Sequence, residues 1–499
     1  MAAQSNTTVK RFQRIIRWFE DPTRTIAVLG SLLPLIFLIG FIARYGSHVV
    51  MVDDTLGLVV PIVIAAETNS LTLADVFTLW NGHRHVMTIL TSLLIARITN
   101  WNLYYEYAVA TVTALGSIVL LLTLHARTER PRLHWYLFPL SVLFLSPHLG
   151  IVWTSSLYTL WHYNVFFSLL LVTLLIYMHP SWRKIVVANV VAIFTLLSMG
   201  GGVAAWVVII AYLLLTPSER RPAYLVSTII VGALAVLLYT GGGDAVGVSN
   251  DEGTNLNTLS LFSPLQVVEY IAAVLGGPLA AERTALAITN TAIAGGLLIL
   301  NSIYLIREER WPTVKPWLLA TIYAVVVSGL IALSRYDLGV HVALQERYNT
   351  IGLIAWAALL ALVLTALPIA HKASGIMPRL LVNVNLLALV WIGGLYAFSV
   401  QTTTNTLKGE ITVDDHLALL HCYETYPIRQ LENCDEDWRA EPYDIMAALN
   451  LTAYQDAPRA NILAPDYQPG DAVVIRTDDA WYAVHVRDRL LAGVPADEV

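Results

Sequence analysis

The sequence predicts an all-α polytopic membrane protein with about eleven transmembrane helices, followed by a small soluble α/β domain. Three observations support this prediction. The chain is 56% hydrophobic and only 13% charged, whereas ordinary globular domains contain roughly 25% charged residues. Its apolar residues form long runs that are separated by short basic or acidic loops, which is typical of helical membrane proteins. From about residue 401 onward, acidic residues become frequent and no further apolar run follows.

Residues 1–24 are expected to form a basic interfacial helix on the cytoplasmic side of the membrane. Its basic residues are Lys10, Arg11, Arg14, Arg17 and Arg24. The segment is too basic and too long for the n-region of a signal peptide, and no small-x-small cleavage site ends the apolar run at 25–43. We therefore expect this run to be the first span and the loop after it to lie outside.

Positive charge indicates how many of the later apolar runs cross the membrane. If 85–98 and 103–126 both cross, the basic cluster at 127–132 lies outside, and every later loop violates the positive-inside rule. If only 103–126 crosses, seventeen of the thirty Lys and Arg residues face the cytoplasm. We therefore expect 85–98 to be a re-entrant or juxtamembrane helix. The remaining spans are then approximately 134–152, 155–178, 183–199, 203–216, 223–240, 284–306, 315–334, 349–370 and 378–399.

The membrane domain thus covers 25–400, with outer loops at 47–102, 241–283 and 335–348. The two shortest spans, 183–199 and 203–216, are joined by three consecutive glycines. A tight helical hairpin with close backbone contact is the expected reason for these glycines. The alternative is a site where a ligand approaches the backbone.

Residues 401–499 are expected to form an extracytoplasmic soluble domain with both cysteines, Cys422 and Cys434. The cysteines either form a disulfide, if this side is oxidising, or remain two free thiols. The local pattern predicts a strand at 472–476 and helices at 413–423, 442–451 and 480–492.

Polar residues that are costly near hydrocarbon gather on the predicted outer side. They are Asp53, Asp54, His83, Arg84, His85, Glu269, Arg335, Asp337, His341, Glu346 and Arg347. A carboxylate at the membrane surface can act as a general base or hold a metal, and an arginine suits a phosphate because its planar fork gives two charge-assisted hydrogen bonds. Each residue also has a structural alternative: Asp53 or Asp54 as a helix N-cap, 83–85 as a solvated turn, and Arg347 as half of an ion pair.

The order of these elements resembles the GT-C superfamily of integral-membrane glycosyltransferases. The resemblance includes one span, an outer loop that opens with Asp53 and Asp54, and juxtamembrane helices. The segments W-N-x-H-R at 80–84 and E-R-Y-N-T at 346–350 are also similar to what uncharacterised bacterial members contain. The resemblance covers roughly 25–400. It implies an inverting transfer of a sugar from a polyprenyl-phosphate donor to a glycan, lipid or protein acceptor at the outer face of a bacterial-type plasma membrane.

The resemblance also implies roles for individual residues. By position, Asp53 or Asp54 corresponds to the catalytic acid of the family's first outer loop, and Arg347 to a contact with the donor phosphate. Glu269 or Asp251 is a weak match to a second acidic residue, so a divalent cation is left open and no metal ligand is assigned. The other candidate substrate-binding residues are His83, Arg84, His85, Arg335 and Tyr348. Membrane lipids are expected partners and nucleic acid is not.

Two other functional classes are alternatives. A lipid or glycolipid transporter would place charged residues within its spans near the midplane, but these spans are almost free of them. A non-catalytic scaffold of cell-envelope assembly would tolerate an acidic pair without needing it.

The topology can be tested by thiol labelling in a background where both native cysteines are replaced by serine. A cysteine in place of Arg130 should not react with a membrane-impermeant reagent added from outside, because the positive-inside rule places 127–132 in the cytoplasm. A cysteine in place of Ser70, in the first outer loop, is the positive control. Efficient labelling at position 130 would overturn the eleven-span topology.

Overall fold

The computed structural model describes residues 21–46, 55–80, 83–129, 133–218, 220–241, 263–407, 473–476 and 481–484. Four predictions therefore lie wholly or largely outside the described residues. They are the helix at 1–24, the acidic residues Asp53, Asp54 and Asp251, the two cysteines, and most of the soluble domain.

In the described part of the chain, eight helices are long and apolar enough to cross a membrane. They are α2 (Pro22–Tyr45), α6 (Leu103–Glu129), α9 (Thr159–Tyr177), α12 (Arg221–Thr240), α14 (Thr284–Arg307), α15 (Trp311–Arg335), α16 (Glu346–Lys372) and α17 (Ile376–Leu407). These helices agree with the expected helical multi-pass membrane protein. The number of crossings and the orientation of the termini stay predictions.

Three predicted spans correspond to shorter helices, α7 (Leu133–Phe144), α10 (Trp182–Ser198) and α11 (Ala204–Leu214). The predicted span at 134–152 is not one continuous helix. It consists of α7, a 3-10 turn (η3, Pro147–Leu149) and the single turn α8 (Ile151–Thr154). The physical reason is local: Pro147 opens the 3-10 turn, and Gly150 has a φ of +32°, which a helix cannot contain.

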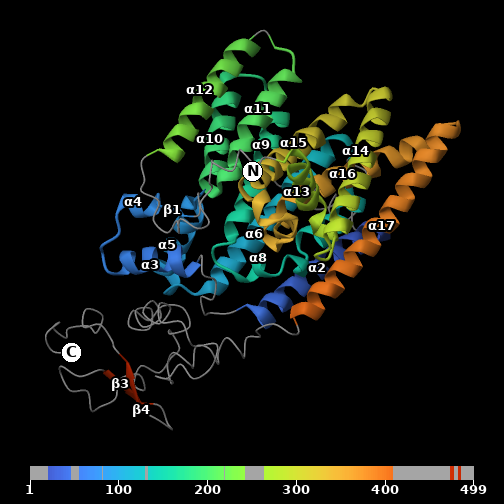
Figure 1. Ribbon diagram of the computed structural model, residues 1–499. Helices are drawn as coiled ribbons and strands as arrows, with labels where there is room; N and C mark the ends of the chain where they lie inside the picture. The colour runs from blue at the N-terminus through green and yellow to red at the C-terminus, as the bar shows by residue number, and fades with distance from the viewer. Residues whose placement is uncertain are drawn as a thin grey trace, which may run out of the picture.

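Helix α5 (Val86–Thr99) covers the run that was expected not to cross. Its 14 residues span about 21 Å, which is less than the roughly 30 Å of a bilayer's hydrocarbon core. Before it, the chain forms η1 (Thr55–Val59), α3 (Val60–Glu67), α4 (Leu73–Val76) and the antiparallel hairpin β1 (Leu79–Trp80) and β2 (His83–Arg84). These elements lie together beside α10 and below α12 in the view of Figure 1.

The remaining helical elements lie between the long helices. They are η4 (Gly200–Val203), α13 (Pro264–Gly276), η6 (Gly277–Leu279), η7 (Tyr336–Leu338) and η8 (Val340–Leu344). Helix α16 lies at the centre of the bundle, where it contacts α7, α9, α13, α14, α15 and α17. By contrast, α2 and α12 expose large apolar side chains such as Phe37 and Leu238. We infer that these two helices face lipid.

In the C-terminal region, β3 (Val473–Arg476) and β4 (Trp481–Val484) form an antiparallel pair. The strand predicted at 472–476 agrees with β3. The helix predicted at 480–492 is wrong at its start, because Trp481–Val484 is a strand. Aromatic and β-branched side chains favour the extended conformation, and these four residues pair with β3. The wider α/β domain stays a prediction.

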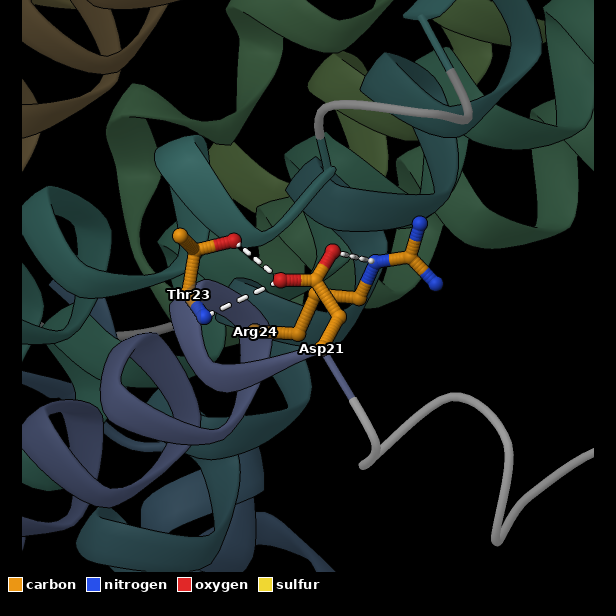
Figure 2. A network of polar contacts seen from close by, with 3 residues as sticks. All are labelled: Asp21, Thr23 and Arg24. Atoms are coloured by element: carbon orange, nitrogen blue, oxygen red, sulfur yellow. Dashed lines mark hydrogen bonds and ion pairs between the residues drawn. The ribbon is translucent and has the colours of Figure 1, made fainter.

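The first span begins where its sequence provides a cap. Figure 2 shows the Asp21 carboxylate accepting hydrogen bonds from the backbone N–H (3.0 Å) and the hydroxyl (2.6 Å) of Thr23. The Arg24 Nε lies 3.1 Å from the other carboxylate oxygen. Pro22 follows at the first helical position, where its missing N–H leaves no bond unmade. The hydrogen bond from the Thr23 hydroxyl is the main reason that the pKa of Asp21 is lowered.

Close packing between α13 and α14 depends on one glycine. Gly276 is the last residue of α13, and a Cβ at this position would lie 1.9 Å from the carbonyl oxygen of Ala287 on α14. We therefore expect Gly276→Ala to force the two helices apart and to cost about 1–3 kcal/mol of stability, the range for overpacking. Thermal unfolding in detergent measures the loss.

Gly295 on α14 is the matched control, because a Cβ there would meet nothing within 4 Å. Gly295→Ala should leave the midpoint unchanged or raise it slightly, since alanine is the better helix former. Equal midpoints for the two variants would contradict the close approach of α13 and α14.

Candidate functional site

A cavity of about 280 Å³ opens at one end of the helix bundle. Its walls come from the β1–β2 hairpin, the N-terminal ends of α9 and α16, the η4 turn, and the C-terminal ends of α12 and α15. All of these ends lie on the outer side in the predicted topology. The side chains and glycines that matter for its chemistry are Trp80, His83, His85, Tyr158, Trp161, Gly200, Gly201, Tyr239, Ser334, Arg335, Arg347 and Tyr348.

Five of the predicted site residues therefore meet in one place. They are His83, His85, Arg335, Arg347 and Tyr348. Two other candidates, Arg84 and Glu269, are not among the residues that line the cavity. Glu269 lies on α13 and is partly exposed. The candidate catalytic residues Asp53 and Asp54 fall outside the described residues, so their place is not established.

Arg347 is held at the cavity by polar and aromatic neighbours. Its Nε donates to the side-chain oxygen of Gln345 (2.9 Å), and its Nη1 donates to the Tyr158 hydroxyl (3.3 Å). The guanidinium carbon lies 5.2 Å from the centre of the Tyr348 ring and 5.9 Å from that of Tyr158. These rings orient the guanidinium through cation–π contacts. Arg347 is thus a positioned cation in the cavity wall.

Arg84 has a different position, and its contacts are with the backbone. Its Nε donates to the carbonyl of Tyr239 (2.6 Å), its Nη2 to that of Gly241 (3.3 Å), and its Nη1 to that of Phe77. Its own backbone N–H donates to the Tyr239 hydroxyl at 2.7 Å. Arg84 therefore binds the β1–β2 hairpin to the end of α12, and the hairpin in turn carries His83 and Trp80 into the cavity wall.

Two of the three consecutive glycines, Gly200 and Gly202, lack space for a side chain, each for a different structural reason. A Cβ at Gly202 would lie 2.3 Å from the carbonyl carbon of Thr195, which agrees with the expected tight hairpin between α10 and α11. A Cβ at Gly200 would lie 2.6 Å from the Nδ1 of His83. Gly200 thus makes room for a cavity-lining histidine, and the backbone here forms part of the cavity wall.

The segment that directly follows Asp54 in the chain contacts the cavity wall. A Cβ at Gly57 in η1 would lie 2.3 Å from the Cη2 of Trp80, so the indole ring packs directly on the η1 backbone. Trp80 itself lines the cavity. The described part of the first outer loop is therefore in contact with the site.

Glu106 is the polar residue that sequence reasoning missed. It lies in the first turn of α6, is fully buried, and accepts a 2.7 Å hydrogen bond from the Trp101 indole. The hydroxyls of Ser92 and Ser156 are its other polar neighbours. The signal in the sequence that could have identified Glu106 is a single acidic residue in an otherwise apolar run. Glu106 lies outside the cavity lining, where α5, α6 and the segment before α9 meet.

No group of three or more His, Cys, Asp or Glu residues in the described part of the chain could hold a metal ion. Comparisons of this chain with protein-family models, curated proteins and solved structures find no match. The function must therefore be argued from the chemistry of the site.

The buried His85 predicts a pH dependence of stability. Burial and, to a lesser extent, the nearby His83 lower the pKa of His85 to about 3, although a hydrogen bond with the Trp80 backbone partly opposes them. In the unfolded chain the pKa returns to its ordinary value of 6.5. Between these two values the unfolded state binds a proton that the folded state does not. Stability therefore falls as the pH drops below 6.5, by up to about 1.4 kcal/mol per pH unit.

Accordingly, the thermal unfolding midpoint of His85→Gln should depend less on pH, between 7.5 and 4.5, than that of the unchanged protein. His341→Gln is the control, because it removes an exposed histidine by the same substitution. If His85→Gln and the unchanged protein lose stability in parallel on acidification, His85 is not a buried neutral group.

Proposed function

We propose that the protein is an inverting glycosyltransferase of bacterial-type plasma membrane. It transfers a sugar from a polyprenyl-phosphate donor to a glycan, lipid or protein acceptor at the outer face. The observation that supports this best is the cavity in which two arginines, Arg335 and Arg347, meet aromatic side chains at the ends of membrane helices. Small-molecule sites commonly combine apolar and aromatic walls with a few placed polar groups.

The arginines suit the phosphate of a lipid-linked donor. Arg335 is the last residue of α15, and Arg347 is the second residue of α16. Both are therefore near the level of the headgroups, where a donor's phosphate can reach them while its polyprenyl chain stays in hydrocarbon. A guanidinium gives a phosphate two parallel charge-assisted hydrogen bonds, and its charge stabilises a phosphate leaving group.

In this reaction an acceptor hydroxyl oxygen attacks the anomeric carbon from the face opposite the phosphate. The bond from the anomeric carbon to the phosphate oxygen breaks, and its electron pair leaves with the polyprenyl phosphate. The hydroxyl proton goes to a carboxylate, for which Asp53 and Asp54 are the candidates. Asp54 precedes Gly57 by three positions in the chain, and Gly57 packs on Trp80 of the cavity wall. This short separation in the sequence supports the assignment.

A lipid or glycolipid transporter and a non-catalytic scaffold are the alternatives. Buried charge inside the spans would favour a transporter. Glu106 and Lys184 are such charges among the described residues, but each lies in the first turn of its helix and not near the middle. The transferase therefore has the stronger support.

The proposal can be tested with purified protein and a set of polyprenyl-phosphate sugars. Replacing the general base should lower the rate by roughly 10²–10⁴ with folding intact. The test variants are Asp53→Asn and Asp54→Asn, of which one should be nearly inactive. Asp337→Asn is the control, because Asp337 is exposed and outside the cavity lining.

Donor binding is measured separately with polyprenyl phosphate that carries no sugar. Arg347→Ala should weaken its binding more than it slows turnover of bound donor, and Arg347→Lys should restore binding only in part, because an ammonium lacks the planar fork. Arg44→Ala, which removes an exposed arginine at the end of α2, should bind normally. Full activity in both Asn variants together with unchanged binding by Arg347→Ala would rule out this site.

A further inference from the structure

Three cations gather at the end of the bundle opposite the cavity. They are Arg127 on α6, Lys184 on α10 and Lys315 on α15, and they surround Tyr212 on α11. The Nζ atoms of Lys184 and Lys315 lie 4.2 Å and 4.5 Å from the centre of the Tyr212 ring. Arg127 lies 5.3 Å from the neighbouring Tyr177 ring. Three helices that are far apart in the sequence, α6, α10 and α15, thus bring three positive charges together.

Lys184 forms the buried base of this cluster. It is 2% exposed, and its ammonium donates to the carbonyls of Leu175 and Met178 and to the Tyr212 hydroxyl. These three acceptors use all three of its N–H donors. The two carbonyls belong to the C-terminal end of α9, which carries only about half of a negative charge. The helix end therefore compensates a fraction of one cation, not three.

The other two cations have more N–H donors than hydrogen-bond partners among the described residues. Lys315 is half-buried and donates to the Thr216 hydroxyl, and Arg127 donates from one Nη to the Ile176 carbonyl. By their chemistry, an ammonium with one partner keeps two N–H groups and a guanidinium with one partner keeps four. Among the residues whose side chains the structure describes, which do not include Glu129 or Glu219, the ion pair is Arg24 with Asp21, and none of these three cations has a carboxylate within 4.0 Å.

The positive-inside rule alone does not explain this arrangement. Basic residues that only set orientation are solvated in loops, where water screens their repulsion. Here one charge is buried and a second is half-buried beside it, so water can compensate neither fully. A cluster of like charges with donors left over is stable when an anion occupies it.

We propose that Arg127 and Lys315, with Lys184 behind them, bind a phosphate group. A guanidinium fork beside an ammonium is the donor pair that phosphate recognition uses. Basic pockets between membrane helices bind the headgroups of anionic lipids, and the cluster lies at the helix ends where such headgroups are found. A free phosphate ion presents the same oxygens, and the experiment separates these two sources.

The test uses the full chain, freed of bound lipid and held in a zwitterionic detergent. Thermal unfolding is followed after adding phosphatidylglycerol or phosphatidylcholine, and separately after adding inorganic phosphate or chloride at equal ionic strength. Phosphatidylglycerol should raise the midpoint by about 2–4 °C more than phosphatidylcholine does. A response to phosphatidylglycerol alone identifies a lipid headgroup, and a response to inorganic phosphate identifies the free ion as a ligand.

The variants Arg127→Gln and Lys315→Gln should lose most of this shift. Both should fold, because each removes one charge from a cluster of like charges, and Arg127 is exposed. Arg307→Gln is the matched control, because Arg307 is an exposed arginine at the same end of the bundle, on α14. It should keep the full shift. The proposal is wrong if neither anion raises the midpoint, if both cluster variants respond like the unchanged protein, or if Arg307→Gln loses as much.

Discussion

The hydrocarbon core of a bilayer offers no hydrogen-bond partners to a peptide backbone, and this constraint governs where the protein can build a site. Within the described bundle the long elements are continuous helices. Irregular backbone occurs at their ends, and three of these connections contribute to the cavity wall: the turns before α9, between α10 and α11, and between α15 and α16. All three of these turns are at the same end of the bundle, and the cavity forms there. Turns can present glycine backbone and side chains in directions that a helix cannot. The polar and aromatic residues of the cavity are therefore concentrated at these turns.

Arg84 in the β1–β2 hairpin is a charged residue whose role is structural and does not require contact with a ligand. Arg84 is 6% exposed, and its donors are directed to the backbone carbonyl of Phe77, just before the hairpin, and to those of Tyr239 and Gly241 at the end of α12. Charge-assisted hydrogen bonds of this kind are strong in a poorly solvated setting, and removing the guanidinium would leave buried carbonyls without donors. Its importance for the site is indirect, because His83 and Trp80 depend on where the hairpin lies.

Much of the fold could be predicted from the sequence, because apolar run length reports directly on membrane helices. The cavity end was also predictable in part: the positive-inside rule places His83, Arg335 and Arg347 on one side, and the described structure brings them together. The role of Arg84 was not predictable, since its partner Tyr239 is 155 residues away in the chain. Glu106 was not predicted, because one acidic residue changes the mean hydropathy of an apolar run only slightly.

The break at 145–150 and the strand at Trp481–Val484 are different cases, because local signals for both were present in the sequence. A proline and a glycine three positions apart interrupt the predicted span at Pro147 and Gly150. The consecutive aromatic residues Trp481 and Tyr482 of β4 favour a strand over a helix. In a short segment, residues of these types decide whether the chain forms a helix or another structure. The wider soluble domain stays a prediction.

The contact between Gly200 and His83 has a consequence for how the cavity can change its width. A side chain at Gly200 would meet both the His83 ring, at 2.6 Å, and the Tyr239 hydroxyl, at 3.3 Å. The same hydroxyl accepts the backbone hydrogen bond of Arg84. The hairpin, the η4 turn and the end of α12 thus touch at one point without free space between them. A side chain at position 200 would push the hairpin and the end of α12 away from the η4 turn together, so the width of the cavity on this side depends on glycine at that position.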